Sequence, residues 1–157
     1  MKKSLPFTAA AVAACAGLGS VATRQVGSAW YRALRKPRIQ PPPVAFPVVW
    51  TTLYADLAVT SAFALDRLRA PADDQERGYA VALGVNLALN AAWSWVFFGF
   101  HRLGPSVLVA GALTVSSVDL VRRTADADER AAAALAPYAA WCAFATVLSA
   151  AVWRANR

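Results

Sequence analysis

The residues best suited to hold a small molecule are two amides and two aromatic rings in one apolar stretch. Asn86, Asn90, Trp93 and Phe97 are three or four positions apart, so in a helix they share one face. An amide in an apolar setting needs a hydrogen-bonding partner, and a flat ring stacks on other flat rings. The pattern indicates either a ligand-binding face or a face that bonds to neighbouring helices.

Two other apolar stretches carry comparable faces. Small-molecule pockets are built in this way, apolar with a few polar groups, although the same stripe is also ordinary in a packed helical core. One face consists of Trp50, Tyr54, Ala58 and Ser61, and the other of Tyr138, Trp141, Ala145 and Leu148. We predict that the three faces meet around one cavity.

The residues of a typical enzyme active site are missing from the sequence. We find no nucleophile–base pair and no cofactor motif. The single histidine, His101, and the cysteines Cys15 and Cys142 do not have the spacing of metal ligands. We therefore assign no catalytic residue and no metal ligand, and we expect that no cofactor is required.

The stretches that carry these residues are long and apolar enough to cross a membrane. Of the 157 residues, 58% are hydrophobic and 16% are charged, whereas a soluble domain has about 25% charged residues. Nearly uncharged runs cover residues 5–22, 43–65, 78–100, 105–120 and 131–152, and a helix of ~20 residues spans a bilayer. We predict an all-α membrane protein, a five-transmembrane-helix bundle forming a single domain over residues 1–157.

The first run has a second interpretation. Lys2 and Lys3 precede a short apolar segment, as in a secretory signal, and residues 12–15 resemble a lipoprotein cleavage site. The apolar run continues past Cys15 without a break. An uncleaved membrane span is therefore the favoured interpretation.

The connections between the runs are short. The longest covers residues 24–42, and its end is too rich in proline to be a regular helix, so we expect an extended strap on the membrane surface. We expect polar loops at residues 66–77 and 122–130, and a tight turn at residues 101–104. Pro137 should lie in the first turns of the last span.

One acidic residue lies in the middle of a predicted span. A charge there costs about 3 kcal/mol, and Asp56 falls on the side of the helix opposite Tyr54. Thr52 and Thr60, one turn away on either side, are predicted to solvate the carboxyl group. Protonation, or contact with a second chain, are the alternatives.

The third span also has a face of small residues, Ala80, Gly84, Ala88 and Ala92. Such a face lets another helix approach closely, either within the monomer or across a homodimer through this helix.

The net charge of +7 raises the possibility of nucleic-acid binding, but the basic residues flank apolar spans. We expect them to contact anionic membrane lipid, and we expect no nucleic-acid partner. Basic residues are evenly divided between the two sides, so the positive-inside rule does not decide the orientation. The dense first loop weakly favours placing that loop and the C-terminus in the cytoplasm.

Three motifs in order resemble the TspO/translocator-protein family. The first runs from Trp30-Tyr31 through Lys36-Pro37 and residues 41–42 to residues 49–54. The second covers residues 88–93 and 97–99, and the third covers residues 137–145 and 152–154. The resemblance extends from about residue 17 to residue 154 and also favours an uncleaved first helix.

The resemblance implies a five-helix bundle, often homodimeric, with a pocket for porphyrins such as protoporphyrin or haem. The matching pocket positions are Trp50, Tyr54, Asn90, Trp93, Ala145 and Leu148, and Asn86 stands where the family often has glutamine or asparagine. The propionates of a porphyrin would then pair with Arg35, Lys36 or Arg38 of the first loop.

Several positions depart from the family pattern. Val44, Pro105, Val109 and Ser149 replace residues that are tryptophan, tryptophan, acidic and asparagine in many relatives. Ala150 replaces the tyrosine of the proposed cholesterol motif of animal members, which argues against a sterol ligand.

Taken with this resemblance, the sequence predicts a tetrapyrrole-binding sensory or transport protein, multi-pass in a bacterial cell membrane. Other hydrophobic small molecules are further candidate ligands. One alternative is a membrane enzyme that promotes porphyrin degradation, in which Trp50, Trp93 or Trp141 would be redox partners. Another is a structural partner of other membrane proteins.

Overall fold

The structure is a computed structural model that describes residues 3–69 and 74–157. Within these residues it is helical without a strand, and five helices are long and apolar enough to span a membrane. They are α1 (Leu5–Thr23, with the short η1, Arg24–Gly27), α3 (Ala45–Leu68), α4 (Asp74–Ser94, with η2, Trp95–Gly99), α5 (Leu103–Ala127) and α6 (Glu129–Ala155). This confirms the prediction of an all-α, five-helix membrane bundle.

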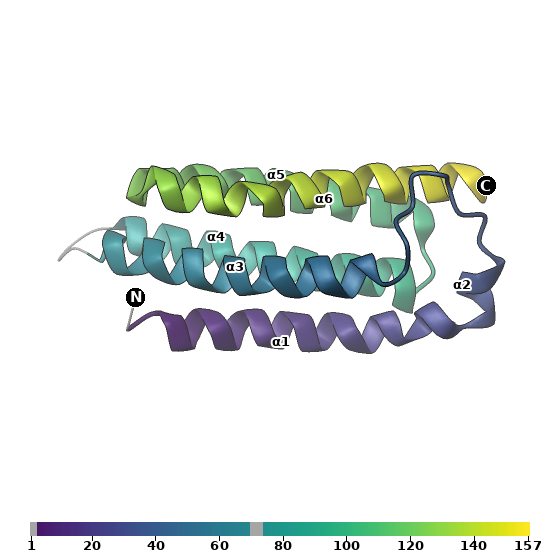
Figure 1. Ribbon diagram of the computed structural model, residues 1–157, viewed down its shortest axis with the longest axis horizontal. Coiled ribbons are helices and arrows are strands. Elements are labelled where there is room, and N and C mark those ends of the chain that lie inside the picture. Colours follow the sequence, from purple (N-terminus) through teal and green to yellow (C-terminus); the bar gives the residue numbers. More distant parts are fainter. Residues whose placement is uncertain (1–2, 70–73) are drawn as a thin grey trace.

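The long helices lie side by side along one axis (Figure 1). The N-terminus is at one end, which we call the distal end. The other end carries α2 (Ala29–Ala33), residues 34–44, the turn between η2 and α5, and the C-terminus. We call it the lid end, because residues 28–43 lie over the bundle there.

The first apolar run is a packed helix of this bundle. Helix α1 contacts α3 and α4. The Thr8 hydroxyl donates to the Ala58 carbonyl at 2.8 Å, and the Ser4 hydroxyl donates to the Asp66 carboxylate at 2.7 Å. Such bonds help to hold membrane helices together, because in lipid the hydrophobic effect does not drive helices to associate. Lys2, part of the signal-like pattern, lies outside the described residues.

The prediction of a polar loop at residues 122–130 was wrong, because α5 runs to Ala127 and α6 begins at Glu129. Asp128 alone separates α5 from α6: its N–H donates to the Thr124 carbonyl, and its carboxylate accepts the N–H groups of Arg130 and Ala131. Because this cap starts α6 at Glu129, Pro137 lies inside the helix and not in its first turns. The expected loop at residues 66–77 is also shorter, since α3 ends at Leu68 and α4 begins at Asp74; residues 70–73 fall outside the described range.

The environment predicted for Asp56 was also wrong. Thr60 donates its hydroxyl to the Asp56 main-chain carbonyl, and Thr52 donates to the Val48 carbonyl. Both hydroxyls therefore bond the helix backbone, as threonine commonly does in helices. The half-buried Asp56 carboxyl keeps one oxygen, Oδ2, without a hydrogen-bond partner.

Two contacts hold the lid end together. The Trp30 ring stacks on the His101 ring of the η2–α5 turn, with centroids 3.9 Å apart. The Asn156 side chain binds the Arg35 backbone twice, accepting from its N–H at 2.8 Å and donating to its carbonyl at 3.0 Å. Residues 34–43, which follow α2, are not helical, as their prolines predict.

Asp128 gives the distal end a pH-dependent cap. Hydrogen bonds from the Ala131 and Arg130 backbones, and Arg67 at 3.7 Å, lower the pKa of the Asp128 carboxyl. A lowered folded-state pKa stabilises the fold above the unfolded-state value of about 3.9, and this stability is lost as pH falls through the folded-state pKa. We expect the thermal midpoint in detergent to fall more steeply below about pH 4 in the parent than in Asp128→Asn, whose amide caps without titrating. Parallel pH profiles would contradict this.

Candidate functional site

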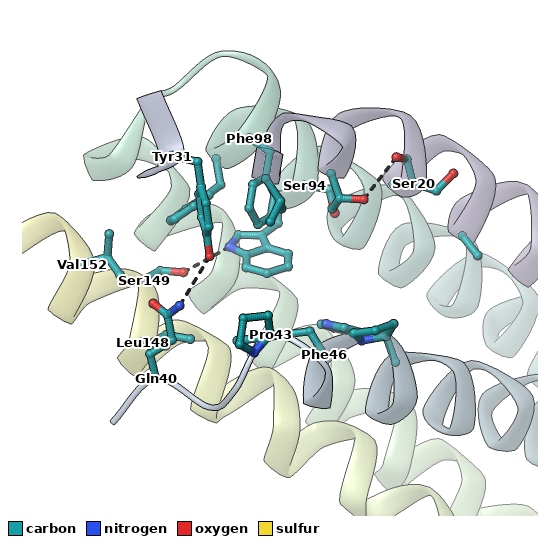
Figure 2. A pocket seen from close by; sticks show the side chains of 18 of the residues that line it. Ser20, Tyr31, Gln40, Pro43, Phe46, Ser94, Phe98, Leu148, Ser149 and Val152 are labelled. Carbon is teal, nitrogen blue, oxygen red and sulfur yellow. Dashed lines mark hydrogen bonds between the residues drawn. The ribbon is translucent and has the colours of Figure 1, made fainter. Parts of the chain in front are cut away.

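A cavity of about 710 Å³ opens between the helices at the lid end (Figure 2). Helices α1, α3, α4 with η2, and α6 form its walls, and residues 31–43 cover it. The lining residues are Ala16, Gly19, Ser20, Thr23, Val26, Tyr31, Leu34, Lys36, Gln40, Pro43, Phe46, Pro47, Trp50, Thr51, Tyr54, Trp93, Ser94, Phe97, Phe98, Leu148, Ser149 and Val152.

One wall of the cavity is aromatic. Trp50 of α3 lies between Tyr54 and Trp93, with ring centroids 5.4 and 6.1 Å away, and Trp93 contacts Phe97 at 6.2 Å. These separations are typical of favourable aromatic pairs. The Trp93 indole N–H donates to the Ser149 hydroxyl of α6 at 3.2 Å, which fixes the plane of that ring. The wall is therefore a preformed aromatic surface, in which neighbouring rings are tilted to one another by 32°, 36° and 43°.

Helix α4 changes its winding where it meets the cavity. Residues Trp95–Gly99 form a π-helical turn, a feature frequent at functional sites, and both Phe97 and Phe98 line the cavity. Gly99 permits this turn, since a Cβ there would lie 2.7 Å from Cε3 of Trp95. The sequence alone predicted an unbroken helix to residue 100.

Beneath the aromatic wall runs a chain of buried hydrogen bonds. Tyr54 donates to Asn90 at 2.8 Å, Asn90 donates to the Tyr138 hydroxyl at 3.1 Å, and Tyr138 donates to Asn86 at 2.6 Å. Asn86 then donates to Ser117 of α5 at 3.0 Å. The chain ties α3, α4, α5 and α6 together and uses both asparagine amides inside the protein.

The structure divides the predicted site residues into two layers. Trp50, Tyr54, Trp93, Phe97 and Leu148 line the cavity. The others lie behind the lining: Asn86, Asn90 and Tyr138 in the buried chain, Trp141 with its ring edge-on to Trp50 at 6.5 Å, and Ala145 packed with Trp93.

The three predicted lid cations also differ in position. Lys36 lines the cavity, where its Nζ donates to the Tyr31 carbonyl at 3.1 Å and lies 4.8 Å above the Tyr31 ring. Arg35 and Arg38 are exposed and are not among the lining residues. Burial raises the pKa of the Tyr31 phenol, and the hydrogen bond from Gln40 lowers it in part, so Tyr31 is neutral at pH 7.

Sequence reasoning missed the contribution of α1. Ala16, Gly19, Ser20 and Thr23 form one wall, and Tyr31, Leu34 and Gln40 of the lid complete the cover. The α1 positions are three or four apart, like the other faces, but they are small and carry no aromatic ring. The available signal was a small-residue face opposite large aromatic ones.

Fold and cavity together define a multi-pass membrane protein with a ligand-sized, aromatic intramembrane site. The TspO/MBR family pattern matches residues 7–154, and the chain therefore belongs to the TspO/MBR family. It is 33% identical to Protein CrtK of Rhodobacter capsulatus (98% of this chain, 94% of the relative) and 34% identical to the Translocator protein of Homo sapiens (98% and 89%). It is 28% identical to the Tryptophan-rich sensory protein of Cereibacter sphaeroides (92% and 88%).

The buried chain predicts energetic coupling between α4 and α6. Asn86 and Tyr138 are completely buried and share the shortest bond of the chain, so we expect a coupling of about 1 kcal/mol in a double-mutant cycle of Asn86→Ala and Tyr138→Phe. The readout is unfolding in detergent. Asn86→Ala with Thr52→Ala, an exposed hydroxyl on α3, should be additive within about 0.5 kcal/mol. Equal coupling in both cycles would contradict the assignment.

Proposed function

We propose that this TspO/MBR protein binds a tetrapyrrole in the lid-end cavity and acts in sensing or transport of that ligand. The observation that carries the proposal is the pairing of an aromatic wall, Trp50, Trp93 and Phe97, with a cation at the rim, Lys36. A porphyrin has the matching chemistry, an apolar planar ring with carboxylates along one edge.

The cavity volume supports a ligand of this class. About 710 Å³ falls within the usual range of small-molecule sites, about 300–1,000 Å³. The lining is mainly apolar, with an amide at Gln40 and hydroxyls at Ser20, Thr23, Tyr31, Thr51, Tyr54, Ser94 and Ser149. Because the asparagines are occupied below the wall, the polar contacts to a ligand fall to these hydroxyls, to Gln40 and to Lys36.

Lys36 gives the proposal its sharpest test, since only an acidic porphyrin can pair with it. The probes are protoporphyrin IX and its dimethyl ester, titrated by fluorescence quenching in detergent. We expect Lys36→Gln to weaken the free acid by up to about 1 kcal/mol at low salt, less at high salt, and to leave the ester unchanged. Arg38→Gln removes an equal charge outside the lining and should leave both affinities near those of the parent.

The aromatic wall is tested on the same two ligands. Trp93→Ala should weaken both by about 1 kcal/mol or more through lost ring contacts, whereas Trp153→Ala, outside the cavity, should not. If folded Trp93→Ala and Tyr54→Ala proteins both bind like the parent, the ligand does not occupy this cavity. Stoichiometric binding without product supports sensing or transport, and turnover would point to an enzyme.

We also propose a homodimer through α4. In the monomer Gly84 and Ala88 are exposed, space around a Cβ at Gly84 is open, and Val81 and Val85 beside it are 61% and 50% exposed. A small face of this kind permits close helix approach. We expect Gly84→Leu to reduce crosslinked dimer in detergent or bilayers, while Gly17→Leu, an equally open glycine on α1, leaves it intact. Undiminished crosslinking of Gly84→Leu places any interface elsewhere.

For the host we propose a bacterial cell membrane. Ala150, which stands in place of the tyrosine of the animal cholesterol motif, supports this assignment and a ligand other than sterol.

A further inference from the structure

The two ends of the bundle differ sharply in charge. In the described residues the distal part balances its charges, with Lys3, Arg67, Arg69, Arg77, Arg122, Arg123 and Arg130 against Asp66, Asp74, Glu76, Asp119, Asp126, Asp128 and Glu129. Ion pairs form there between Arg67 and Asp128, Arg69 and Glu76, and Arg123 and Asp119.

The lid end, by contrast, has basic side chains without a described Asp or Glu beside them: Arg24, Arg32, Arg35, Lys36, Arg38, Arg102, Arg154 and Arg157. A surface of this kind attracts the anionic headgroups of one membrane leaflet. Attraction alone specifies no site, because a bound lipid needs a surface for its acyl chain as well as a cation for its phosphate.

One lid-end cation lies beside such a surface. Arg102 lines an open groove of about 450 Å³ together with Val96, Phe100 and Pro105. Arg102 lies between the spans that end at Gly99 and begin at Leu103, which puts it at the level of the headgroups. Phe100 is 64% exposed, so the groove combines an apolar surface with a cation.

The backbone builds this groove. The Phe100 N–H donates to the Trp95 carbonyl at 2.7 Å, and the Arg102 N–H donates to the Val96 carbonyl at 2.9 Å. His101 between them adopts a left-handed conformation, with φ of 56°, which reverses the chain. Arg102 is thereby placed at the end of the π-helical turn, where it lines the groove with Phe100 and Pro105.

We propose that this groove is a binding site for one anionic phospholipid. The Arg102 guanidinium pairs with the phosphate, by charge-assisted hydrogen bonds, and an acyl chain lies along Val96, Phe100 and Pro105. No lining residue is shared with the tetrapyrrole cavity, so the lipid site stands apart from the proposed function. The neighbouring lid-end cations raise the local concentration of anionic lipid at the groove.

The test measures lipid affinity from the rise in thermal midpoint on titrating phosphatidylglycerol or phosphatidylcholine into protein in neutral detergent, because a ligand of the folded state stabilises it by mass action. We expect phosphatidylglycerol to bind the parent more tightly than phosphatidylcholine. Arg102→Gln should weaken phosphatidylglycerol about fivefold, for one lost cation near the headgroups, and should weaken phosphatidylcholine less, because the choline cation already neutralises its phosphate. Phe100→Ala should weaken both lipids.

Arg122→Gln is the matched control, since it removes the same charge at the opposite, charge-balanced end of α5. It should keep the affinity of the parent for phosphatidylglycerol. Equal losses in Arg122→Gln and Arg102→Gln would overturn the site in favour of net charge alone. Unchanged affinity in Arg102→Gln would also overturn it.

Inorganic phosphate serves as the control that distinguishes a lipid ligand from a free phosphate ion at Arg102. We expect it to give no midpoint shift at the phosphate concentration supplied by the lipid, because the acyl contact is missing; an equal shift would overturn the lipid assignment. Arg102→Gln should bind protoporphyrin IX like the parent. Failure of the cavity proposal would appear in the porphyrin titrations and failure of the lipid site in the lipid titrations, so each can fail alone.

Discussion

The structure depends on the buried hydrogen-bond chain from Tyr54 through Asn90, Tyr138 and Asn86 to Ser117. Lipid tails are as apolar as leucine, so burial of apolar side chains does not choose how membrane helices meet. An amide in hydrocarbon, by contrast, must find a partner. Each asparagine of α4 reaches two other helices, and together they fix the rotation and depth of α3, α5 and α6 about α4. The positions of these helices also set the geometry of the aromatic wall, because Tyr54 belongs both to the wall and to the hydrogen-bond chain.

The first loop is under a different constraint. After α2, the prolines of residues 34–43 prevent a helix, so only side chains and isolated backbone groups can attach this segment to the bundle. Trp30 stacks on His101 at one side, and Asn156 binds the Arg35 backbone at the other. Tyr31 lies between these attachments, Lys36 and Gln40 follow them, and all three line the cavity. The first loop is thus attached to two different helix ends. In this arrangement Lys36 lies at the rim of the cavity, whereas Arg35 and Arg38 are exposed and do not line it.

The fold could be predicted from the sequence because its cause is local: apolar length decides which segments span the membrane, and periodicity decides which faces turn inward. The same periodicity found Trp50, Tyr54 and Trp93. Periodicity could not distinguish the residues that line the cavity from those that lie behind the lining. Asn86, Tyr138 and Trp141 share the same helix faces as the lining residues and differ only in depth. The α1 wall carries only small side chains, so its periodic face lacks the aromatic rings that marked the other faces. The single-residue connection at Asp128 depends on a cap that bonds two backbone N–H groups, which composition does not reveal.

The lid-end cations lie outside the aromatic cavity, and this limits how much they can contribute to the affinity for a ligand. The cavity walls are neutral, and the nearest lining cation, Lys36, already binds the Tyr31 carbonyl and ring. A carboxylate ligand therefore exchanges an existing Lys36 contact for a new one, and its net gain is smaller than that of an ion pair formed from free partners. Affinity must then come chiefly from the rings of Trp50 and Trp93, with Lys36 orienting the ligand edge. In the proposed function, the surrounding cations would act at longer range, by concentrating anionic ligands at the lid end.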